Sequence, residues 1–535
     1  MRKRKDKELE ALIATFGKPK GAFFSFDKIE RYFRNKDNST AFQVLSDKTC
    51  NDLDFQQLFM FLDRTNSKVG QQYLYNKLRT ISVETANNEL NESVIKKFIE
   101  DSDFRINTQK LLAKLGKNDV YYISSLFQEE HLKQPKWYFV VPLLSFTSIL
   151  SIIMLFVIPQ VFFILLVVYI INFGIHLWNK NNLVHYLGSI PELLRMKRIA
   201  LKLYKDGQLL KEINPDLPDS IKIIDQVGKR MAFFQLEAKI QGEIEAFFFV
   251  FFELIKILFL IEPLMLFGVL KQLNTKRVEI ENVFSFVGHI DALFAIASLR
   301  KGLDTYCIPK IEKKHNKIKA NNLYHPLIFD CVRNNLEVKD KSILLTGSNM
   351  SGKTSFIRTI GINTITGLTI NTCFAESFAT PIMRIHSAIR ISDDLMNDKS
   401  YYFEEVLTIK DMILKSTNGS ANLFLLDEIY KGTNTIERIS AGKAVLSYLA
   451  KHENLVFVST HDMELTDLLS EEFDLYHFSE QVDDKNVDFD YTLKVGKLKN
   501  RNAIRILQIN DYPANIINEA IELSERLDKI ASASD

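Results

Sequence analysis

The sequence predicts an α + α/β protein, in which a mainly helical part is followed by an α/β domain. Three observations support this prediction. Up to about residue 320, apolar residues recur at three-to-four spacing and proline and glycine are sparse, which is typical of amphipathic helices. Within that part, residues 137–178 contain no Asp, Glu, Lys or Arg. From residue 321 on, short apolar strands alternate with helical patterns, as in a parallel sheet covered by helices.

Length and composition limit the class of protein. A chain of 535 residues is long enough for about two to four domains. We expect an N-terminal segment (1–49), a helical domain (50–320) and an α/β domain (321–535). The net charge of +2 does not by itself indicate a nucleic-acid binder. The four cysteines show no paired spacing, which argues against a disulfide framework or zinc site. The charged N-terminus has no apolar stretch after it and is not a secretory signal.

The uncharged stretch is predicted to be a transmembrane helical hairpin. It is about twice the roughly 20 residues that one crossing needs, and Ile158-Pro159-Gln160 interrupts it near the middle. The only two tryptophans, Trp137 and Trp178, bracket it, with lysines just outside, as in segments anchored at a bilayer interface. A hairpin returns both tryptophans to the same side. The alternative is a buried hairpin in a large helical domain.

A second apolar stretch, residues 246–270, contains Glu253, Lys256 and Glu262. Because one charge at mid-bilayer costs on the order of 3 kcal/mol, a spanning segment is disfavoured. We interpret it as a buried or interfacial helix. The remaining helical patterns cover residues 54–78, 90–115 and 183–210.

The α/β part contains a phosphate-binding loop. Residues 347–354 match G-x-x-x-x-G-K-[ST], after an apolar strand (341–346) and before a helical pattern (354–365). The loop amides and the helix N-terminus would surround phosphate oxygens, Lys353 would reach the β- and γ-phosphates of ATP, and Thr354 would bind Mg²⁺. The predicted nucleotide-binding residues are Gly347, Ser348, Asn349, Met350, Ser351, Gly352, Lys353, Thr354 and Ser355.

Two further strands end in candidate catalytic residues. The strand at 422–426 leads into Asp427, which would hold Mg²⁺, and Glu428, which would act as general base on the attacking water. The strand at 454–459 leads into His461, placed to sense the γ-phosphate. An acidic pair capping a surface strand is the alternative, but it is disfavoured after a complete phosphate loop.

The detailed motifs resemble the ATPase domain of the MutS mismatch-repair proteins. The resemblance is carried by TGSNMSGKT (346–354), LDEIYKGTNT (426–435) and STH (459–461), with YHPL (324–327), RISDDL (390–395), KS (399–400) and FEE (403–405) in support. It extends weakly upstream through LDRTNSKVG (62–70) and VGHIDAL (287–293), and covers roughly residues 50–130 and 180–525.

The resemblance implies a helical core and lever domain and an ATPase domain of the type found in ABC transporters. It also implies a homodimer in which Ser400 approaches the partner's γ-phosphate and residues 504–527 help hold the subunits together. The chain departs from the family pattern in three respects. We expect no mismatch-reading domain before residue 50, and the hairpin at 137–178 falls in the part where the family's DNA clamp is inserted. Tyr430-Lys431-Gly432 replaces Gly-Arg-Gly, and Cys331-Val332 stands where an aromatic often meets adenine.

These observations favour a membrane-anchored MutS-type ATPase, with its ATPase domain in the cytoplasm, that acts on DNA. Lysine and arginine clusters at 196–198 and 313–317 are candidate phosphate contacts. An alternative is a membrane-bound, ATP-driven conformational switch acting on a protein or lipid. An ABC-transporter half is disfavoured, because two helices cannot enclose a conduit.

Overall fold

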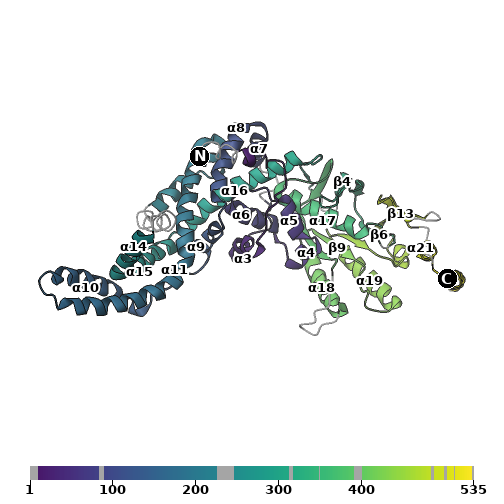
Figure 1. Ribbon diagram of the computed structural model, residues 1–535. Helices are drawn as coiled ribbons and strands as arrows, with labels where there is room; N and C mark the ends of the chain where they lie inside the picture. Colours follow the sequence, from purple (N-terminus) through teal and green to yellow (C-terminus); the bar gives the residue numbers. More distant parts are fainter. Residues whose placement is uncertain are drawn as a thin grey trace. The chain divides into compact units, whose positions relative to one another are not determined.

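The structure is a computed structural model of the chain, shown as a ribbon in Figure 1. It describes residues 10–83, 89–225, 246–312, 317–348, 350–390, 401–482, 487–498, 503–510 and 512–532. The chain forms two compact units. The first, called here the helical unit, comprises Met1–Asn38, Leu62–Lys77 and Asn88–Gly302. The second, the α/β unit, comprises Ser39–Phe61, Leu78–Asn87 and Leu303–Asp535. Helices and a mainly parallel sheet therefore occur together, as the sequence predicts.

The helical unit is organised around α16 (Arg277–Gly302), whose residues from Ile280 onward are mostly buried. Helices α7 and α11 pack against it. Its other helices are α2 (Phe26–Ile29), α3 (Arg31–Asn35), α6 (Lys68–Arg79, whose last two residues belong to the α/β unit), α7 (Glu89–Glu100), α8 (Ser102–Leu112), α9 (Ser125–Gln128), α10 (Val140–Leu155), α11 (Val161–Asp206), α12 (Gln208–Ile213), α14 (Ala246–Phe259) and α15 (Ile261–Asn274), with 3₁₀ turns at Ala113–Leu115, Asn118–Ile123 and Lys136–Phe139.

The helical pattern at residues 54–78 is two helices, not one. Helix α5 (Phe55–Leu62) ends before Asp63, and α6 begins at Lys68. Asp63 accepts hydrogen bonds from the amide and hydroxyl of Thr65, at 2.9 and 2.6 Å. Asp291 accepts from the amides of Asn66 and Ser67, at 2.8 and 2.7 Å, and so caps α6. Side chains that compete for backbone amides explain the interruption.

Helices α10 and α11 form an antiparallel hairpin that turns at residues 156–160, where the sequence predicts a turn. The rings of Trp137 and Trp178 meet edge to face, with centroids 5.0 Å apart, so both lie at the same end of the hairpin. Helix α11 does not stop at Trp178 but continues for 46 residues in all, joining the apolar stretch to the helical pattern predicted at 183–210.

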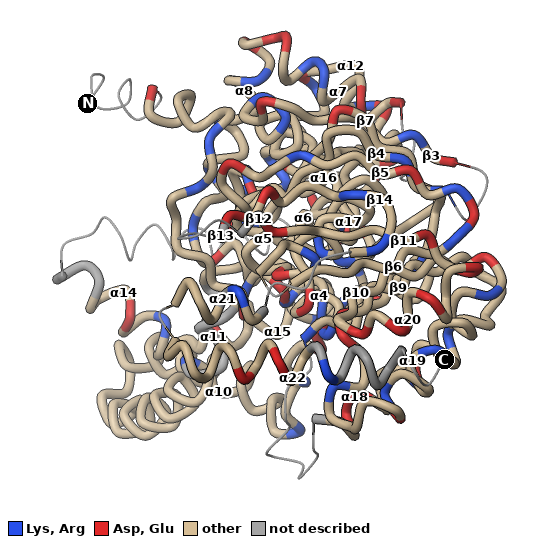
Figure 2. Tube along the Cα trace, turned by 90° about the vertical axis from the view of Figure 1, so that its right-hand side faces the viewer, with Lys and Arg blue, Asp and Glu red and all other residues tan. Residues whose placement is uncertain are grey.

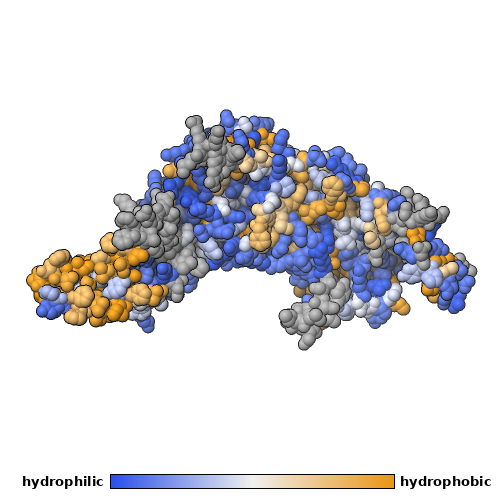
Figure 3. Space-filling view, in the orientation of Figure 1, coloured by the Kyte–Doolittle hydropathy of each residue, from blue (hydrophilic) through white to orange (hydrophobic). Residues whose placement is uncertain are grey.

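The hairpin exposes its apolar side chains. Figure 3 shows them as a continuous orange surface over α10 and the first half of α11, and Figure 2 shows α10 free of charged residues. By length and composition, three helical segments of the described residues could cross a membrane: Lys136–Leu155, Val161–Lys180 and Arg277–Gly302. In the third segment, 83% of the most apolar 18-residue stretch is buried inside the protein, whereas the corresponding shares in the first two are 28% and 17%. Helix α16 is therefore a core helix, whereas most of the apolar surface of the hairpin is not covered by the rest of the protein.

The second apolar stretch is also two helices, α14 and α15, separated at Leu260, whose φ is +46°. Both contact α10 and α11. Val141, Leu144, Val168 and Leu260 form a buried apolar cluster where these helices meet. The expectation of one continuous helix over 246–270 is therefore wrong, and the left-handed residue is where it breaks.

The α/β unit is built on a six-stranded sheet of order β14-β11-β6-β10-β9-β8. All neighbouring pairs are parallel except β14 with β11. The predicted strands at 341–346, 422–426 and 454–459 are β6, β9 and β10 at its centre. The strands of this sheet are β6 (Ser342–Thr346), β8 (Arg384–Ala388), β9 (Asn422–Asp427), β10 (Leu455–Ser459), β11 (Phe473–His477) and β14 (Lys494–Val495).

Three smaller sheets complete the strands of the described residues: β1 (Gln43–Val44) with β2 (Thr80–Ile81), β12 (Glu480–Val482) with β13 (Val487–Phe489), and the four-stranded sheet β3 (Lys310–Glu312), β7 (Ser377–Pro381), β4 (Ile318–Leu323) and β5 (Asn334–Val338). The helices of this unit are α4 (Asp47–Asp52), α5, α17 (Lys353–Ile370), α18 (Tyr401–Ser416), α19 (Thr435–Leu449), α20 (Glu464–Leu468), α21 (Ala503–Ile509) and α22 (Ala514–Ser532).

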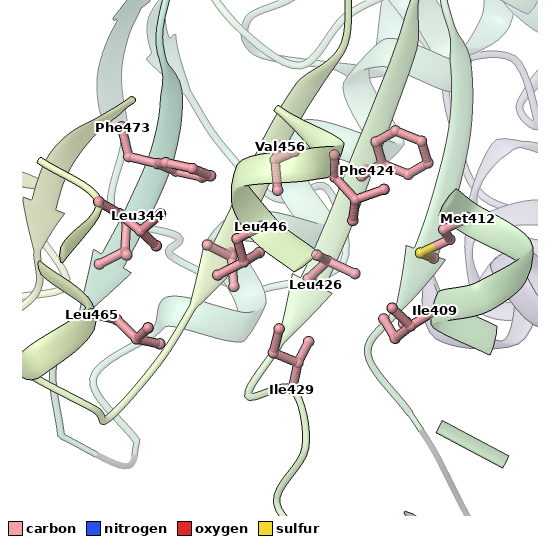
Figure 4. Packing of buried hydrophobic residues seen from close by; sticks show 14 of the residues in the cluster. Leu344, Ile409, Met412, Phe424, Leu426, Ile429, Leu446, Val456, Leu465 and Phe473 are labelled. Carbon is pink, nitrogen blue, oxygen red and sulfur yellow. The ribbon is translucent and has the colours of Figure 1, made fainter. Parts of the chain in front are cut away.

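Strands β6, β9 and β10 are apolar because both faces of the sheet are covered. All five residues of β6 and of β10 are buried. On one face, Leu344, Phe424 and Val456 pack with residues of α18 and α19 (Figure 4). Helix α17 contacts β9 and β10. This packing fixes the carboxyl ends of the three strands side by side, which is where ligands bind in open α/β sheets.

Candidate nucleotide-binding site

The loop after β6 and Glu428, directly after β9, border a cavity of about 490 Å³, and β10 lies between these two strands in the sheet. Its lining brings together residues that are far apart in the sequence. Of the predicted site residues, the cavity is lined by Ser348, Met350, Ser351, Gly352, Lys353, Thr354, Ser355 and Glu428. Asn349 and Ser400 lie outside the described residues.

The loop from β6 to α17 has the backbone that its glycines predict. Gly347 has φ +150° and Gly352 has φ +103°, values that suit glycine. A Cβ on Gly347 would lie 2.7 Å from the carbonyl oxygen of Phe478, so no larger residue fits there. Gly352 immediately precedes α17, whose first amides are free to bind an anion.

Lys353 lies folded against its own loop. Its Nζ donates to the carbonyl oxygens of Gly347 and Ser348, at 2.7 and 2.8 Å, and lies 3.4 Å from His461 Nε2. Burial lowers the pKa of Lys353, against the opposing effect of Glu428 and Asp427. A buried ammonium held mainly by carbonyl oxygens near these carboxylates is well placed to exchange those contacts for phosphate oxygens.

Thr354 and Asp427 face each other. The Thr354 hydroxyl donates to Asp427 Oδ2 at 2.7 Å, and Asp427 Oδ1 accepts from the Ser459 hydroxyl. Hydroxyl and carboxylate oxygens are ligands that Mg²⁺ accepts, and Mg²⁺ is typically held by one or two such groups together with phosphates. The residues therefore fit this ion. The Ser459 contact, which the sequence analysis missed, orients the carboxylate.

Glu428 contacts the side chains of His461 and Lys431. Its Oε1 lies 2.8 Å from His461 Nε2, and its Oε2 pairs with Lys431 Nζ. Burial raises the pKa of Glu428, but the hydrogen bonds and charges of His461 and Lys431 outweigh that effect and lower it to about 2. Glu428 is thus ionised, as a base must be. Its two oxygens contact His461 and Lys431 in this state.

The turn after β9 is strained at two residues other than glycine. Glu428 has φ +48° and Tyr430 has φ +63°. Such left-handed residues cost on the order of 1–3 kcal/mol and cluster at functional sites. The turn is held in place because Glu428 N donates to Ser459 O at 2.9 Å and Tyr430 N to Glu405 Oε1 at 2.5 Å. Tyr430 stands where the family pattern has a glycine and adopts the conformation that glycine would favour.

The cavity also contains aromatic side chains that the sequence analysis did not assign to it. Phe329 and Tyr491 line it, together with Cys331 and Val332. Phe329 is 92% exposed, and a ring atom of Tyr491 lies 3.2 Å from where a Cβ on Gly352 would be. Glu480 accepts a hydrogen bond from Ser348 at 2.8 Å. Tyr491 and Glu480 lie more than a hundred residues beyond the loop, and no local pattern marks them.

Comparison with known proteins gives one family match in this part of the chain. Residues 343–528 match the family model of MutS domain V. The chain is 31% identical over 283 residues to the DNA mismatch repair protein MSH3 of Kluyveromyces lactis, covering 49% of this chain and 27% of that protein. It is 30% identical over 279 residues to the DNA mismatch repair protein MutS of Petrotoga mobilis, covering 48% and 33%.

A third relative, the DNA mismatch repair protein MutS of Fusobacterium nucleatum, is 28% identical over 268 residues, covering 45% of this chain and 29% of that protein. The chain therefore spans about a third or less of the length of the curated relatives it matches. The membrane hairpin, and the expectation that the chain does not itself read mismatches, stay predictions. The match to domain V, the relatives and the motifs of residues 346–461 agree with one another: residues 343–528 are similar to domain V of the MutS proteins.

Proposed function

We propose that the chain is an ATPase that binds ATP with Mg²⁺ and hydrolyses it to ADP and phosphate. The observation that carries this proposal is the convergence of Lys353, Thr354 with Asp427, and Glu428 with His461 at the carboxyl ends of three neighbouring strands. These residues supply a phosphate-binding cation, oxygen ligands for a metal ion and a base.

Each group has a distinct role in the proposed reaction. Lys353 would leave the loop carbonyls and bind the β- and γ-phosphates. Thr354 and Asp427 would hold Mg²⁺, which would supply positive charge beside the phosphates. Glu428 orients the attacking water and accepts its proton, and His461 contacts the γ-phosphate side of the site. Glu428 must first be released from Lys431, so this ion pair keeps the base inactive before ATP is bound.

The ATPase is proposed to work as a homodimer. Ser400 would complete the partner subunit's site, and residues 504–527 would contribute to the contact between subunits. Helix α22 supports this role, because it exposes Ile516 and Leu523. ATP binding would close the two ATPase domains and hydrolysis would open them. Measuring the mass of the detergent-solubilised protein with and without ATP tests this: a protein that stays monomeric in both conditions contradicts it.

The hairpin α10–α11 is proposed to anchor the protein in a membrane, with the ATPase domain in the cytoplasm. Its support is the exposed apolar surface and the paired tryptophans at one end. Fractionation of cells that express the full-length chain is the test. The protein should sediment with membranes, remain there in high salt and alkaline carbonate, and be released by detergent. Recovery in the soluble fraction without detergent contradicts the anchor.

We propose that this ATPase acts on duplex DNA. The supporting observation is a basic cleft of about 500 Å³ in the helical unit, lined by Lys114, Arg195, Arg198 and Lys202 around Leu111 and Ile199. Arg195 pairs with Glu192 at 2.6 Å, and the cations of Lys114, Arg198 and Lys202 can follow a phosphate backbone. The predicted cluster at 196–198 contributes only Arg198 to the cleft lining, and Lys197 pairs with Asp225. Most of the cluster at 313–317 lies outside the described residues.

DNA binding by the detergent-solubilised protein, measured across salt concentrations, tests this assignment. We expect measurable affinity near 50 mM salt that falls steeply toward 200 mM. Replacing Arg198 and Lys202 by glutamine should weaken binding and reduce the salt dependence. The same change at Lys96, which pairs with Glu100 on the surface of α7, should not. Undetectable binding at the lowest salt would favour the second candidate, a membrane-bound switch that moves a protein or lipid partner.

A further inference from the structure

A cluster of buried charged groups lies where α11 passes the break between α14 and α15. The break leaves carbonyl groups at the end of α14 without helical partners, and side chains of the hairpin bind them. Ser145 donates to the carbonyl oxygen of Phe259 at 2.9 Å, and Asn172 donates to that of Leu258 at 2.8 Å. The broken helix is therefore fixed against the hairpin (Figure 1 shows α14 and α15 beside α11).

Four ionisable side chains meet beside this break. His176 comes from α11, Glu253 and Lys256 from α14, and Glu262 from α15. The side chains of His176, Lys256 and Glu262 are 4%, 2% and 3% exposed, and that of Glu253 is 17% exposed. Charged groups are rarely buried to this extent without a structural or functional reason, and least of all beside an apolar hairpin.

The oxygens of the two carboxylates are divided between two partners. Lys256 Nζ binds Glu253 Oε1 at 2.7 Å and Glu262 Oε1 at 2.6 Å. The second oxygens face the imidazole: Glu253 Oε2 lies 3.6 Å from His176 Nε2, and Glu262 Oε2 lies 3.5 Å from His176 Nδ1. Glu262 Oε2 and His176 Nδ1 are buried and have no hydrogen-bond partner. Lys256 therefore pairs with one oxygen of each carboxylate and leaves the second oxygen of each facing the imidazole.

The separations on the imidazole side are too long for charge-assisted hydrogen bonds, which are about 2.7–2.9 Å. They involve the two different nitrogens of one imidazole, and an ion binds only one of these. One of the two separations is then a ligand–ligand distance, close to the roughly 3.0–3.5 Å expected for bond lengths near 2.1 Å. One ligand atom from each of His176, Glu253 and Glu262 can be chosen so that all lie within 4.8 Å of one another. The two carboxylates also outnumber the single ammonium of Lys256, so an added cation is electrostatically favoured.

We propose that His176, Glu253 and Glu262 form a binding site for a divalent transition-metal ion such as Zn²⁺. One imidazole nitrogen and two carboxylate oxygens are ligands of this class of ion. Lys256 would remain an outer partner that orients the carboxylates through their other oxygens, as hydrogen-bonding groups around metal sites commonly do. The ion would join α11 to α14 and α15, and so fix the broken helix to the hairpin. The site is separate from the nucleotide site in the α/β unit.

Cobalt titration of the full-length protein in detergent, after treatment with EDTA and without nucleotide, tests the proposal. We expect one Co²⁺ per chain, seen by its visible absorption, and displacement of Co²⁺ by Zn²⁺. His176→Gln and Glu262→Gln should each lower the affinity by on the order of 10–100-fold. Asp427→Asn, which alters the nucleotide site, should leave this binding unchanged. His131→Gln removes a buried histidine elsewhere in the helical unit and is the matched control.

A second variant covers the case in which the ligand variants do not fold. Lys256→Met removes the cation that binds both carboxylates, so this protein should have a lower thermal midpoint in EDTA and recover on addition of Zn²⁺. The wild-type midpoint should also rise with Zn²⁺. The proposal is overturned if the wild type binds no stoichiometric Co²⁺, if binding survives His176→Gln and Glu262→Gln, or if it is lost in Asp427→Asn. Stability that responds to pH but not to metal would identify a proton as the missing cation and would also overturn it.

Discussion

The carboxylate of Glu428 lies 2.8 Å from the imidazole of His461, and both follow neighbouring parallel strands. Glu428 is the proposed base, so Glu428→Gln should still bind ATP but lower turnover by about 10²-fold or more. Binding of a fluorescent ATP analogue and release of phosphate measure the two effects separately. Glu472→Gln is the control, because Glu472 pairs with Lys443 away from the cavity. Hydrolysis by Glu428→Gln at the wild-type rate would exclude Glu428 as the base.

The lowered pKa of Glu428 predicts a pH-dependent contribution to stability. Its pKa falls from 4.5 to about 2 on folding, chiefly because His461 and Lys431 outweigh the effect of burial. A depressed carboxyl pKa stabilises the folded protein above pH 4.5, and this contribution is lost as the pH falls toward 2. It amounts to about 3 kcal/mol at most. The thermal midpoint should therefore fall more steeply between pH 5.5 and pH 3 in the wild type than in Glu428→Gln. Equal slopes would show that the cations do not stabilise this carboxylate.

Asp54 joins two arginines of the α/β unit. It accepts hydrogen bonds from Arg358 on α17 at 3.1 Å and from Arg390, just after β8, at 2.6 Å. Asp54→Asn removes the charge but tolerates the left-handed backbone at φ +52°. We expect a loss of about 1–2 kcal/mol in the free energy of unfolding, since the groups are half-buried. Asp411→Asn, which alters an exposed pair with Lys415, should change stability little. Equal losses in the two variants would contradict a special role for Asp54.

A lysine in the middle of the hairpin should impair membrane insertion. Ile170 is 63% exposed on the part of α11 that is apolar enough to cross a membrane. Ile170→Lys is expected to cost about 3 kcal/mol if this surface meets lipid. The fraction of chains resistant to carbonate extraction measures the effect. Val278→Lys places the same charge on a residue that is 70% exposed on α16, and should have no effect on insertion. Normal insertion of Ile170→Lys would argue that the hairpin is covered by protein instead.

The loop and its flanking strands could be predicted because their information is local. Buried parallel strands are apolar throughout, and the loop, Asp427-Glu428 and His461 follow such strands directly. Parallel packing of β6, β10 and β9 then brings these segments together. The contacts between them depend on side-chain directions. Lys431 pairing with Glu428, Ser459 with Asp427 and Glu480 with Ser348 leave no pattern in the sequence.

The breaks within helices also could not be predicted from the sequence. Periodicity predicts a helix over residues 54–78, and the apolar composition of residues 246–270 predicts a buried or interfacial helix there. However, α5 and α6 are separated by capping carboxylates, one of them the distant Asp291. Helices α14 and α15 are separated at Leu260, where Ser145 and Asn172 bind the free carbonyl groups. Conversely, α11 continues past Trp178 without a break as far as Asp206. Helix ends decided by long-range hydrogen bonds cannot be found from spacing alone.

The sequence by itself determined the resemblance of the α/β part to MutS proteins, the phosphate loop, the residues that follow the three central strands and the uncharged stretch at 137–178. These depend on the identity and spacing of neighbouring residues. Only the tertiary structure showed that Glu428 is held between His461 and Lys431, and that His176, Glu253 and Glu262 converge beside a broken helix. Charge pairing and ligand geometry act over a few ångströms in space, and the fold alone decides which residues come that close.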